Sequence, residues 1–512
     1  MSDAALGDAD TLIGPPRPNL VRNTIWSLVG YIVPLPLALV AFPILTQALG
    51  ADRFGVLSLA WALIGYSGIF DLGLGRALTK VVSERLPAAP DEVPALIWST
   101  MTVMVLIGSL SVVAMFLLAP TLVDAVFKVP PELHLEAMRS FQIVAVTLPL
   151  ITTSAGMRGI LEAQQRFRAV GVMNSITWSL MLVAPLVTLP FGRSLVLAMA
   201  ALLVSRLLTW CVYLGLCVIG MPALWPPQMP RLRAAGPTLR FGGWLTVSNI
   251  IGPFLTYFDR FVIGALLSVG AVTYYTVPYD MVLRIGIVAS AVCSVLFPVF
   301  SANYQVNRAV VLQTYQWGLR VIGLAATPLA LAALLLAPEG LSLWLGPAFA
   351  EESTALLRWL AVGVFVNCLA QAPSGLIQGS GRPDLTARLH ALEVLPYLGL
   401  LWVLVTHRGI TGAALAWSLR ATVDALLILA VCHSVFPEGR QAAKRLLMPI
   451  GVAWLLGLAL SGNVSFEIRV ACWTIFVLCY PPVVWIWGLT RAERHTILSS
   501  GRALLHHVPG QS

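Results

Sequence analysis

The dominant feature of the chain is a series of apolar segments, each about twenty residues long, that recurs from Thr24 almost to Leu489. An α-helix needs about 20 apolar residues to cross a bilayer, so each segment is long enough to span a membrane. Hydrophobic residues make up 58% of the sequence and charged residues only 11%, against about 25% charged residues in ordinary soluble domains. A water-soluble core cannot hide that much apolar surface. The sequence therefore predicts a multi-pass membrane protein.

The apolar segments are continuous and lack the alternation of about ten residues that a β-barrel strand shows. The expected fold class is therefore an all-α integral membrane protein with about fourteen transmembrane helices. The expected spans are 24–48, 55–75, 94–119, 141–160, 170–190, 194–220, 242–267, 271–300, 318–338, 356–378, 388–406, 409–432, 446–462 and 469–489.

The basic residues predict the orientation, because Lys and Arg are retained on the cytoplasmic side during insertion. With the N-terminus inside, 21 of the 32 Lys and Arg residues fall in one set of loops and tails, seven fall in the opposite loops, and four lie within spans. Both termini are therefore expected in the cytoplasm. The net charge of +9 is then explained by contact with anionic inner-leaflet lipid, and no motif suggests nucleic acid.

Three pairs of segments indicate an internal repeat. "RGILEAQQRFRA" at Arg158–Ala169 aligns with "SGLIQGSGRPDL" at Ser374–Leu385 at a separation of 216, which places Gly159 on Gly375. "LVSRLL" aligns with "WSLRAT" at a separation of 214, and "LTQALGADRFGVL" aligns with "IGALLSVGAVTYY" at about 217. An even number of spans in each half gives parallel repeats, related by an axis along the membrane normal.

The repeat divides the chain into two expected six-helix lobes and a final helix pair. The expected parts are a cytoplasmic tail (1–23), an N-terminal lobe (24–220), a cytoplasmic linker (221–240), a C-terminal lobe (241–433), and a last helix pair with a cytoplasmic tail (434–512).

This plan, together with two stretches, resembles a known family. The stretches are "LGADRFGVLSLAWALIGYSGIFDLGLGRALTKVVSERL" at Leu49–Leu86 and "YFDRFVIGALLSVGAVTYYTVPYDMVLRI" at Tyr257–Ile285. They are similar to the polysaccharide-exporter family, which contains the Wzx-type O-antigen flippases and belongs to the multidrug, oligosaccharidyl-lipid and polysaccharide exporter superfamily. The resemblance implies a V-shaped pair of lobes that works by alternating access. It also implies a location in the bacterial cytoplasmic (inner) membrane. There the protein would transport undecaprenyl-pyrophosphate-linked oligosaccharide, used for lipopolysaccharide, capsule or exopolysaccharide, from the inner to the outer leaflet.

Four arginines within the spans, Arg206, Arg260, Arg284 and Arg420, are the candidate substrate-binding residues. A charged side chain at the bilayer centre costs about 2.5 to 3.5 kcal/mol on insertion scales, so each needs a partner or a wet cavity. Arg206 has no acidic residue at neighbouring turns of its own helix. Arg284 follows an aspartate by four residues and Arg420 precedes one by four, so for these two a structural ion pair and a substrate contact are equal alternatives.

Five further charged residues are candidates for ion coupling or gating: Asp71, Arg76, Asp259, Asp280 and Asp424. The aspartates could couple transport to H⁺ or Na⁺. Arg76 has a simpler alternative, since its long side chain can reach the inner headgroups. No other cofactor is expected. The seven cysteines lack metal-ligand spacing and are interpreted as packing residues.

Three other functions remain open. A multidrug antiporter on the same fold would prefer an acidic or neutral cavity for lipophilic cations, whereas the intramembrane charge here is mainly arginine. A lipid II flippase is a close competitor. A membrane-bound enzyme would need acid-base residues at a substrate site, and no catalytic residues are expected. The expected partners are the lipid-linked oligosaccharide, membrane lipids, and polysaccharide polymerase or export machinery.

Overall fold

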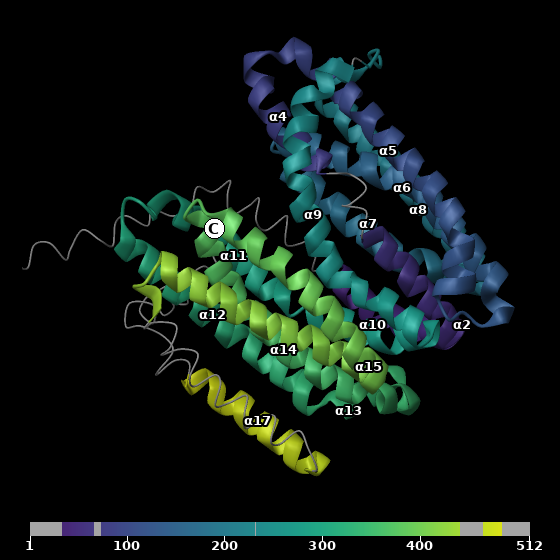
Figure 1. Cartoon of the computed structure of the whole chain (residues 1–512), viewed down its shortest axis with the longest axis vertical. Helices are drawn as coiled ribbons and strands as arrows, with labels where there is room; N and C mark the ends of the chain where they lie inside the picture. The colour runs from purple at the N-terminus through teal and green to yellow at the C-terminus, as the bar shows by residue number, and fades with distance from the viewer. Residues whose placement is uncertain (1–32, 66–72, 231, 441–463, 484–512) are drawn as a thin grey trace, which may run out of the picture. The chain divides into compact units, whose positions relative to one another are not determined.

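The computed structural model describes residues 33–65, 73–230, 232–440 and 464–483. Regular structure in these ranges is helical, and they contain no β-strand. This confirms the all-α class. The long helices, labelled in Figure 1, are α2 (Pro34–Gly65), α4 (Leu74–Ala88), α5 (Val93–Thr121), α6 (His134–Ala163), α7 (Phe167–Thr188), α8 (Leu195–Gly220), α9 (Leu232–Leu266), α10 (Val269–Leu283), α11 (Gly286–Asn303), α12 (Arg308–Leu335), α13 (Ala337–Leu345), α14 (Pro347–Gly379), α15 (Pro383–Val435) and α17 (Phe466–Val483). Short helical turns are η2 (Pro90–Glu92), η3 (Leu122–Val126), η4 (Pro131–Leu133), η5 (Leu189–Phe191) and η6 (Pro222–Leu224).

Nine helical segments of the described residues are long and apolar enough to cross a membrane. They confirm a multi-pass membrane protein, while the count of fourteen spans stays a prediction. Two of the nine each contain two expected spans, because α2 is broken at Gly50 (φ 78°, ψ 168°) and α15 at Gly409 (φ 58°, ψ −142°). Both glycines have a positive φ and lie at or beside the expected span boundaries. Glycine adopts a positive φ at little cost, so the chain can change direction there without a separate loop.

The expected span 271–300 is not one helix. It divides into α10 and α11, which are separated by Arg284 and Ile285. At this break the backbone N–H of Arg284 donates to the carbonyl of Met281 (3.3 Å), and that of Ile285 donates to the carbonyl of Val282 (3.0 Å). These are i to i−3 bonds in place of the α-helical i to i−4 pattern. The interruption therefore lies at a charged residue near the middle of the expected span.

The described helices form two compact units. Unit 1 comprises residues up to Pro278 together with His390–Ala416, and unit 2 comprises Tyr279–Leu389 and the chain from Trp417 onward. The boundary between these units falls after α9, which belongs to unit 1. The sequence instead predicts a lobe boundary before α9, in the linker 221–240, and part of that linker is helical. The expected six-helix lobes therefore stay a prediction.

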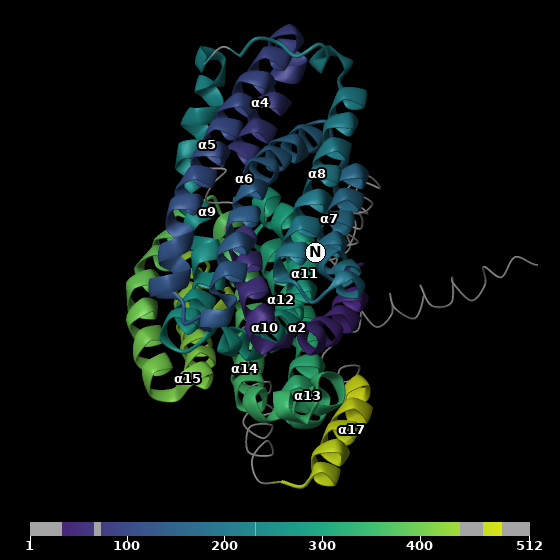
Figure 2. The ribbon, with the colours of Figure 1, turned by 90° about the vertical axis from the view of Figure 1, so that its right-hand side faces the viewer.

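Unit 1 is built around α4, α5, α6 and α8, and α5, α6 and α8 run side by side in both views (Figures 1 and 2). Buried residues such as Leu78, Val82, Met104 and Leu161 form one apolar cluster among them. The backbones of α4 and α6 approach closely at Gly159 of α6, where an added Cβ would lie 2.4 Å from the carbonyl oxygen of Gly75 in α4. Small residues allow membrane helices to pack backbone to backbone in this way.

Unit 2 packs α12 and α14 against each other and against α11. The C-terminal helix α17 joins this unit through α12, because Tyr480 donates a hydrogen bond to the carbonyl of Leu324. At the start of α17, Arg469 is 8% exposed and forms an ion pair with Glu339 of α13. This pair connects the final described helix to the helix pair α12 and α13.

The turns between α6 and α7 and between α14 and α15 have the same backbone structure. Gln165 has φ 58° and Gly381, 216 residues later, has φ 86°. The next residues, Arg166 and Arg382, donate from their backbone N–H groups to the carbonyls of Leu161 (2.9 Å) and Ile377 (3.3 Å). Two further pairs of backbone hydrogen bonds match at the same separation. Gln164 donates to the carbonyl of Ile160 (3.1 Å), as Ser380 does to that of Leu376 (2.9 Å). Gln165 donates to the carbonyl of Glu162 (2.9 Å), as Gly381 does to that of Gln378 (3.1 Å). The two turns therefore share one backbone structure at the expected separation of 216 residues, and the internal repeat itself stays a prediction.

Candidate substrate-binding residues

Arg206 lies in the middle of α8, in unit 1, and its side chain is partly exposed. Its guanidinium donates to the sulfur of Met181 in α7 at 3.8 Å, and it contacts no carboxylate in the part of the chain that the structure describes. A sulfur atom is a weak acceptor and does not neutralise a guanidinium. Arg206 therefore keeps its charge available to a ligand, as the absence of a local acid predicted.

Asp259 and Arg260, near the end of α9, are both buried, at 0% and 2% exposure. One carboxylate oxygen of Asp259 accepts the hydroxyl of Tyr275 in α10, and the other accepts the backbone N–H of Arg260 at 2.8 Å. The Arg260 guanidinium lies over the ring of Tyr257, 5.1 Å from its centroid. These contacts make the pair part of the packing between α9 and α10, which favours a structural role for Asp259.

Arg284 occupies the break between α10 and α11, in unit 2, and is half-buried. Within the described ranges its guanidinium forms no ion pair, and its buried Nε has no hydrogen-bond partner. The structure therefore does not support the pairing with Asp280 that the four-residue spacing allowed, because the helix is interrupted at Arg284. A substrate contact at Arg284 stays a prediction.

Arg420 and Asp424 lie one turn apart in α15, in unit 2. Asp424 is 3% exposed, and the Arg420 guanidinium lies 5.7 Å from the centre of the Trp417 ring. Trp417 also makes an edge contact with Tyr279, at 5.4 Å between ring centroids. The aromatic contact holds the guanidinium by a cation–π interaction. Both alternatives for this pair, an ion pair or a substrate contact, stay open.

Arg76 lies in the first turn of α4 and is exposed, as expected of a side chain that extends to the headgroups. Asp71 lies outside the described residues.

Arg206 and Arg260 belong to unit 1, and Arg284 and Arg420 belong to unit 2. Each unit therefore contributes two of the four intramembrane arginines.

Two ion pairs were not predicted from the sequence, and their arginines, Arg53 and Arg469, are among the seven basic residues of the opposite loops. Arg53 donates to Glu136 at 2.9 Å, and the other oxygen of Glu136 accepts the backbone N–H of Leu195. The second pair joins Arg469 to Glu339. In both pairs the acid lies more than 80 residues away in sequence, so no local spacing signals them. Both partners of each pair fall on the same expected side of the membrane.

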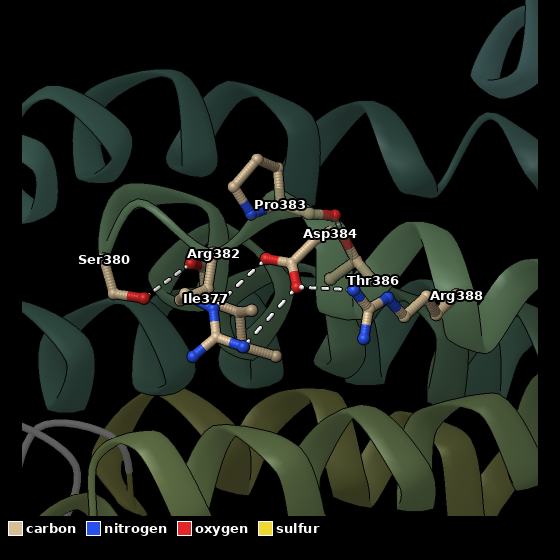
Figure 3. Close-up of polar contacts among 7 residues, drawn as sticks. All are labelled: Ile377, Ser380, Arg382, Pro383, Asp384, Thr386 and Arg388. Atoms are coloured by element: carbon tan, nitrogen blue, oxygen red, sulfur yellow. Dashed lines mark hydrogen bonds and ion pairs between the residues drawn. The ribbon is translucent and has the colours of Figure 1, made fainter. Parts of the chain in front are cut away.

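The turn before α15 holds one carboxylate between two arginines (Figure 3). Arg382 donates to Asp384 at 3.2 Å, and Arg388 lies 3.7 Å from the other oxygen of the same carboxylate. Asp384 precedes the expected span, and the hydrogen bonds from Arg382 lower the pKa of its carboxyl below the ordinary value. Both arginines of this turn therefore have an acidic partner, whereas Arg166 in the repeat-related turn has none in the described ranges.

The family of the chain follows from comparison with known proteins. Residues 20–304, more than half of the chain, match the family model described as "Polysaccharide biosynthesis protein". The chain belongs to the polysaccharide biosynthesis protein family. This confirms the resemblance to polysaccharide exporters. A relative from Shigella flexneri, named "Putative O-antigen transporter", is 29% identical to this family member over 80% of the chain and 97% of the relative.

Two solved structures show that this member of the polysaccharide biosynthesis protein family has a known transporter fold. The lipid II flippase MurJ in an inward closed conformation superposes with a TM-score of 0.70 at 14% identity, over 90% of this chain and 98% of that chain. An inward-facing multidrug resistance MATE transporter of the MOP superfamily superposes with a TM-score of 0.68 at 16% identity, over 82% and 99%. At these identities the likeness establishes the fold alone.

Proposed function

We propose that the protein is a flippase that moves an undecaprenyl-pyrophosphate-linked oligosaccharide from the inner to the outer leaflet of the cytoplasmic membrane. Membership of the polysaccharide biosynthesis family and similarity to a relative named as an O-antigen transporter support this class of cargo. The fold is shared with a lipid II flippase and with multidrug transporters, so the choice among cargoes rests on the chemistry of this chain's own residues.

The observation that carries the proposal is the pair of intramembrane arginines without acidic partners. Arg206 in unit 1 and Arg284 in unit 2 form no ion pair in the described structure, and both lie near the middle of expected spans. An uncompensated guanidinium in a membrane is costly unless it meets water or an anion. Pyrophosphate offers oxygens that a guanidinium can contact through two parallel hydrogen bonds. A lipophilic cation would instead be repelled.

Differential binding explains how such sites drive a transport cycle. The arginines bind the pyrophosphate or acidic sugars while the lipid tail stays in the bilayer, and transport requires that the inward-open and outward-open states differ in affinity for this headgroup. We further propose coupling to H⁺ or Na⁺ through one of the aspartates Asp71, Asp259, Asp280 and Asp424. Asp259 is the weaker candidate, since its carboxylate is occupied by Tyr275 and by a backbone N–H.

The proposal includes an inner-membrane location with both termini in the cytoplasm, supported by the distribution of basic residues. Single cysteines in a background without native thiols test it. We expect an impermeant thiol reagent to label Ser194→Cys and Glu352→Cys in intact cells, because Glu352 is exposed and lies on the same expected outer side. We expect Ser83→Cys, Ala169→Cys and Ser512→Cys to be labelled only after lysis. Labelling of this second group in intact cells would overturn the topology.

The cargo is tested by comparing a null strain with the complemented strain. Loss of the protein should accumulate lipid-linked oligosaccharide in the inner leaflet and leave ethidium efflux unchanged, because positively charged side chains repel cationic dyes. Unaltered glycan with slowed ethidium efflux would replace the proposal with a multidrug antiporter. Accumulated lipid II with early lysis would identify a peptidoglycan-precursor flippase.

A further inference from the structure

A cavity of about 200 Å³ lies in unit 1 among α5, α6 and α8, the three helices that run side by side in Figure 2. Its lining is almost wholly apolar and includes Met101, Val105, Met157, Ile160, Leu214 and Cys217. Two tryptophans also border it. The indole N–H of Trp98 donates to the carbonyl of Leu224 (3.0 Å), and that of Trp210 donates to the hydroxyl of Thr153 (2.8 Å). Because both N–H groups are occupied, the rings offer the cavity only apolar surface, which suits a hydrocarbon chain.

Polar groups lie just beyond one end of this cavity, outside its lining and next to two of its lining residues. Gln164 lies one turn beyond Ile160 in α6, and Gly220 lies one turn beyond Cys217 in α8. A Cβ on Gly220 would lie 2.5 Å from Oε1 of Gln164 and 2.9 Å from Nη1 of Arg166, so both polar groups pack against this glycine. The side-chain oxygen and nitrogen of Gln164 are both buried and have no hydrogen-bond partner in the described structure. Buried amides normally bond to protein, water or ligand, so this amide indicates an occupant.

Arg166 supplies a positive charge at the same end. Its Nη1 lies 3.5 Å from the carbonyl oxygen of Leu216, and it forms no ion pair with an acid of the described ranges. The nearby acid Glu162 instead lies 3.6 Å from Arg158. The polar groups beyond this end of the cavity therefore combine an unneutralised guanidinium with an unsatisfied amide.

The equivalent turn of unit 2 serves as an internal control (Figure 3). Ser380, which corresponds to Gln164, donates its hydroxyl to the carbonyl of Ile377 at 2.7 Å, and Arg382, which corresponds to Arg166, binds Asp384. The same backbone therefore holds satisfied polar groups in unit 2 and unsatisfied ones in unit 1. The two turns differ in their side chains, because Arg168 in unit 1 stands at the position that corresponds to Asp384 in unit 2.

We propose that this corner of unit 1 is a binding site for an anionic phospholipid, with one acyl chain in the cavity and the phosphate on Gln164 and Arg166. The basic residues mark this end of the helices as cytoplasmic, and anionic lipids of that leaflet bind basic pockets between transmembrane helices. The acyl chain matches the apolar lining, and the phosphate accepts hydrogen bonds from both the amide and the guanidinium. The site lies wholly within unit 1, so it does not depend on which cargo the protein carries.

The first test measures phosphatidylglycerol binding to the delipidated full-length protein by native mass spectrometry. Phosphatidylcholine with identical acyl chains is the control ligand. We expect tighter binding of phosphatidylglycerol, and we expect Arg166→Gln to weaken it about tenfold or more, as loss of a charge-assisted hydrogen bond does. The matched variant Arg382→Gln should bind as the unaltered protein does. Equal effects of these two substitutions, or equal binding of the two lipids, would overturn the proposal.

The second test separates the two halves of the site. Leu214→Trp fills the cavity and should weaken phosphatidylglycerol binding, whereas Leu207→Trp, on an exposed part of α8, should not. Gln164→Glu keeps the side-chain size but places a negative charge against the phosphate, so it should weaken binding in a protein that still folds, as checked by its unfolding temperature. Undiminished binding in the Gln164 and Leu214 variants would mean that water alone satisfies the amide. Displacement of phosphatidylglycerol from this site by undecaprenyl pyrophosphate would identify the cargo as the occupant and would also overturn the proposal.

Discussion

Substituting alanine for glycine at two repeat-related positions should have opposite effects on stability. Gly159 and Gly375 are aligned by the repeat, and both lie within long helices, α6 and α14. At Gly159 a Cβ would lie 2.4 Å from the carbonyl oxygen of Gly75 and 2.8 Å from the hydroxyl of Thr79. At Gly375 a Cβ would meet no heavy atom of the described structure within 4 Å. One methyl group therefore clashes in unit 1 and is accommodated in unit 2.

The magnitude follows from two opposing terms. Alanine in place of glycine in a helix stabilises by about 0.5–1 kcal/mol at either position. At Gly159 the methyl must also push α4 and α6 apart by about 1 Å to restore an ordinary contact, and overpacking of this kind costs about 1–3 kcal/mol. The helix-propensity term cancels when the two variants are compared. Gly159→Ala should therefore be less stable than Gly375→Ala by about 1–3 kcal/mol.

The comparison is made on detergent-purified protein by reversible denaturant unfolding, with thermal unfolding midpoints as a second measure. The unaltered protein should lie between the two variants or close to the Gly375→Ala variant. If Gly159→Ala is as stable as Gly375→Ala, then α4 and α6 do not meet backbone to backbone at Gly159, and the packing argument is refuted.

Three further predictions concern charged and polar residues. In a flippase-null strain, the Arg206→Ala variant should restore at least tenfold less surface glycan than the unaltered protein does, with little loss of folded protein. Arg206→Lys should keep part of the activity. Normal surface glycan with the alanine variant would exclude a substrate contact. If Arg420 and Asp424 form an ion pair that serves only structure, the double variant Arg420→Gln with Asp424→Asn should yield more folded protein than either single variant. Equal losses of folded protein in all three variants would show that the two residues act independently. Tyr275→Phe should lower the unfolding free energy by about 1.5–3 kcal/mol, because the buried carboxylate of Asp259 loses a donor; an unchanged unfolding midpoint would contradict this.

Much of the fold was predictable because the bilayer imposes one length and one polarity on every spanning helix. The expected span 194–220 corresponds to α8 at Leu195–Gly220, and 94–119 corresponds to α5 at Val93–Thr121. The break at Arg284 was not predictable from hydropathy, since apolar residues continue on both sides and Gly286 alone does not interrupt a helix. Tertiary packing decides whether such a helix stays continuous.

The candidate site was predictable only where the relevant contact is local. The absence of an acidic partner for Arg206 follows from its helical neighbours and holds in the described structure. The pairing of Arg469 with Glu339 and the orphaned amide of Gln164 depend on helices that are distant in sequence. Four-residue spacing suggested a partner for Arg284, and the helix break cancels that suggestion.

The shared backbone of the two turns at Gln165 and Gly381 separates the shape of a turn from its charge. In both turns the chain reversal is held by main-chain hydrogen bonds, so the geometry places little demand on side-chain identity beyond tolerance of a positive φ. The two turns can therefore carry different side chains on the same backbone. The turn at Gly381 holds a carboxylate between two arginines, and the turn at Gln165 presents a cation and an amide to a ligand. Two parts of one chain can in this way keep the same architecture and differ in what they bind.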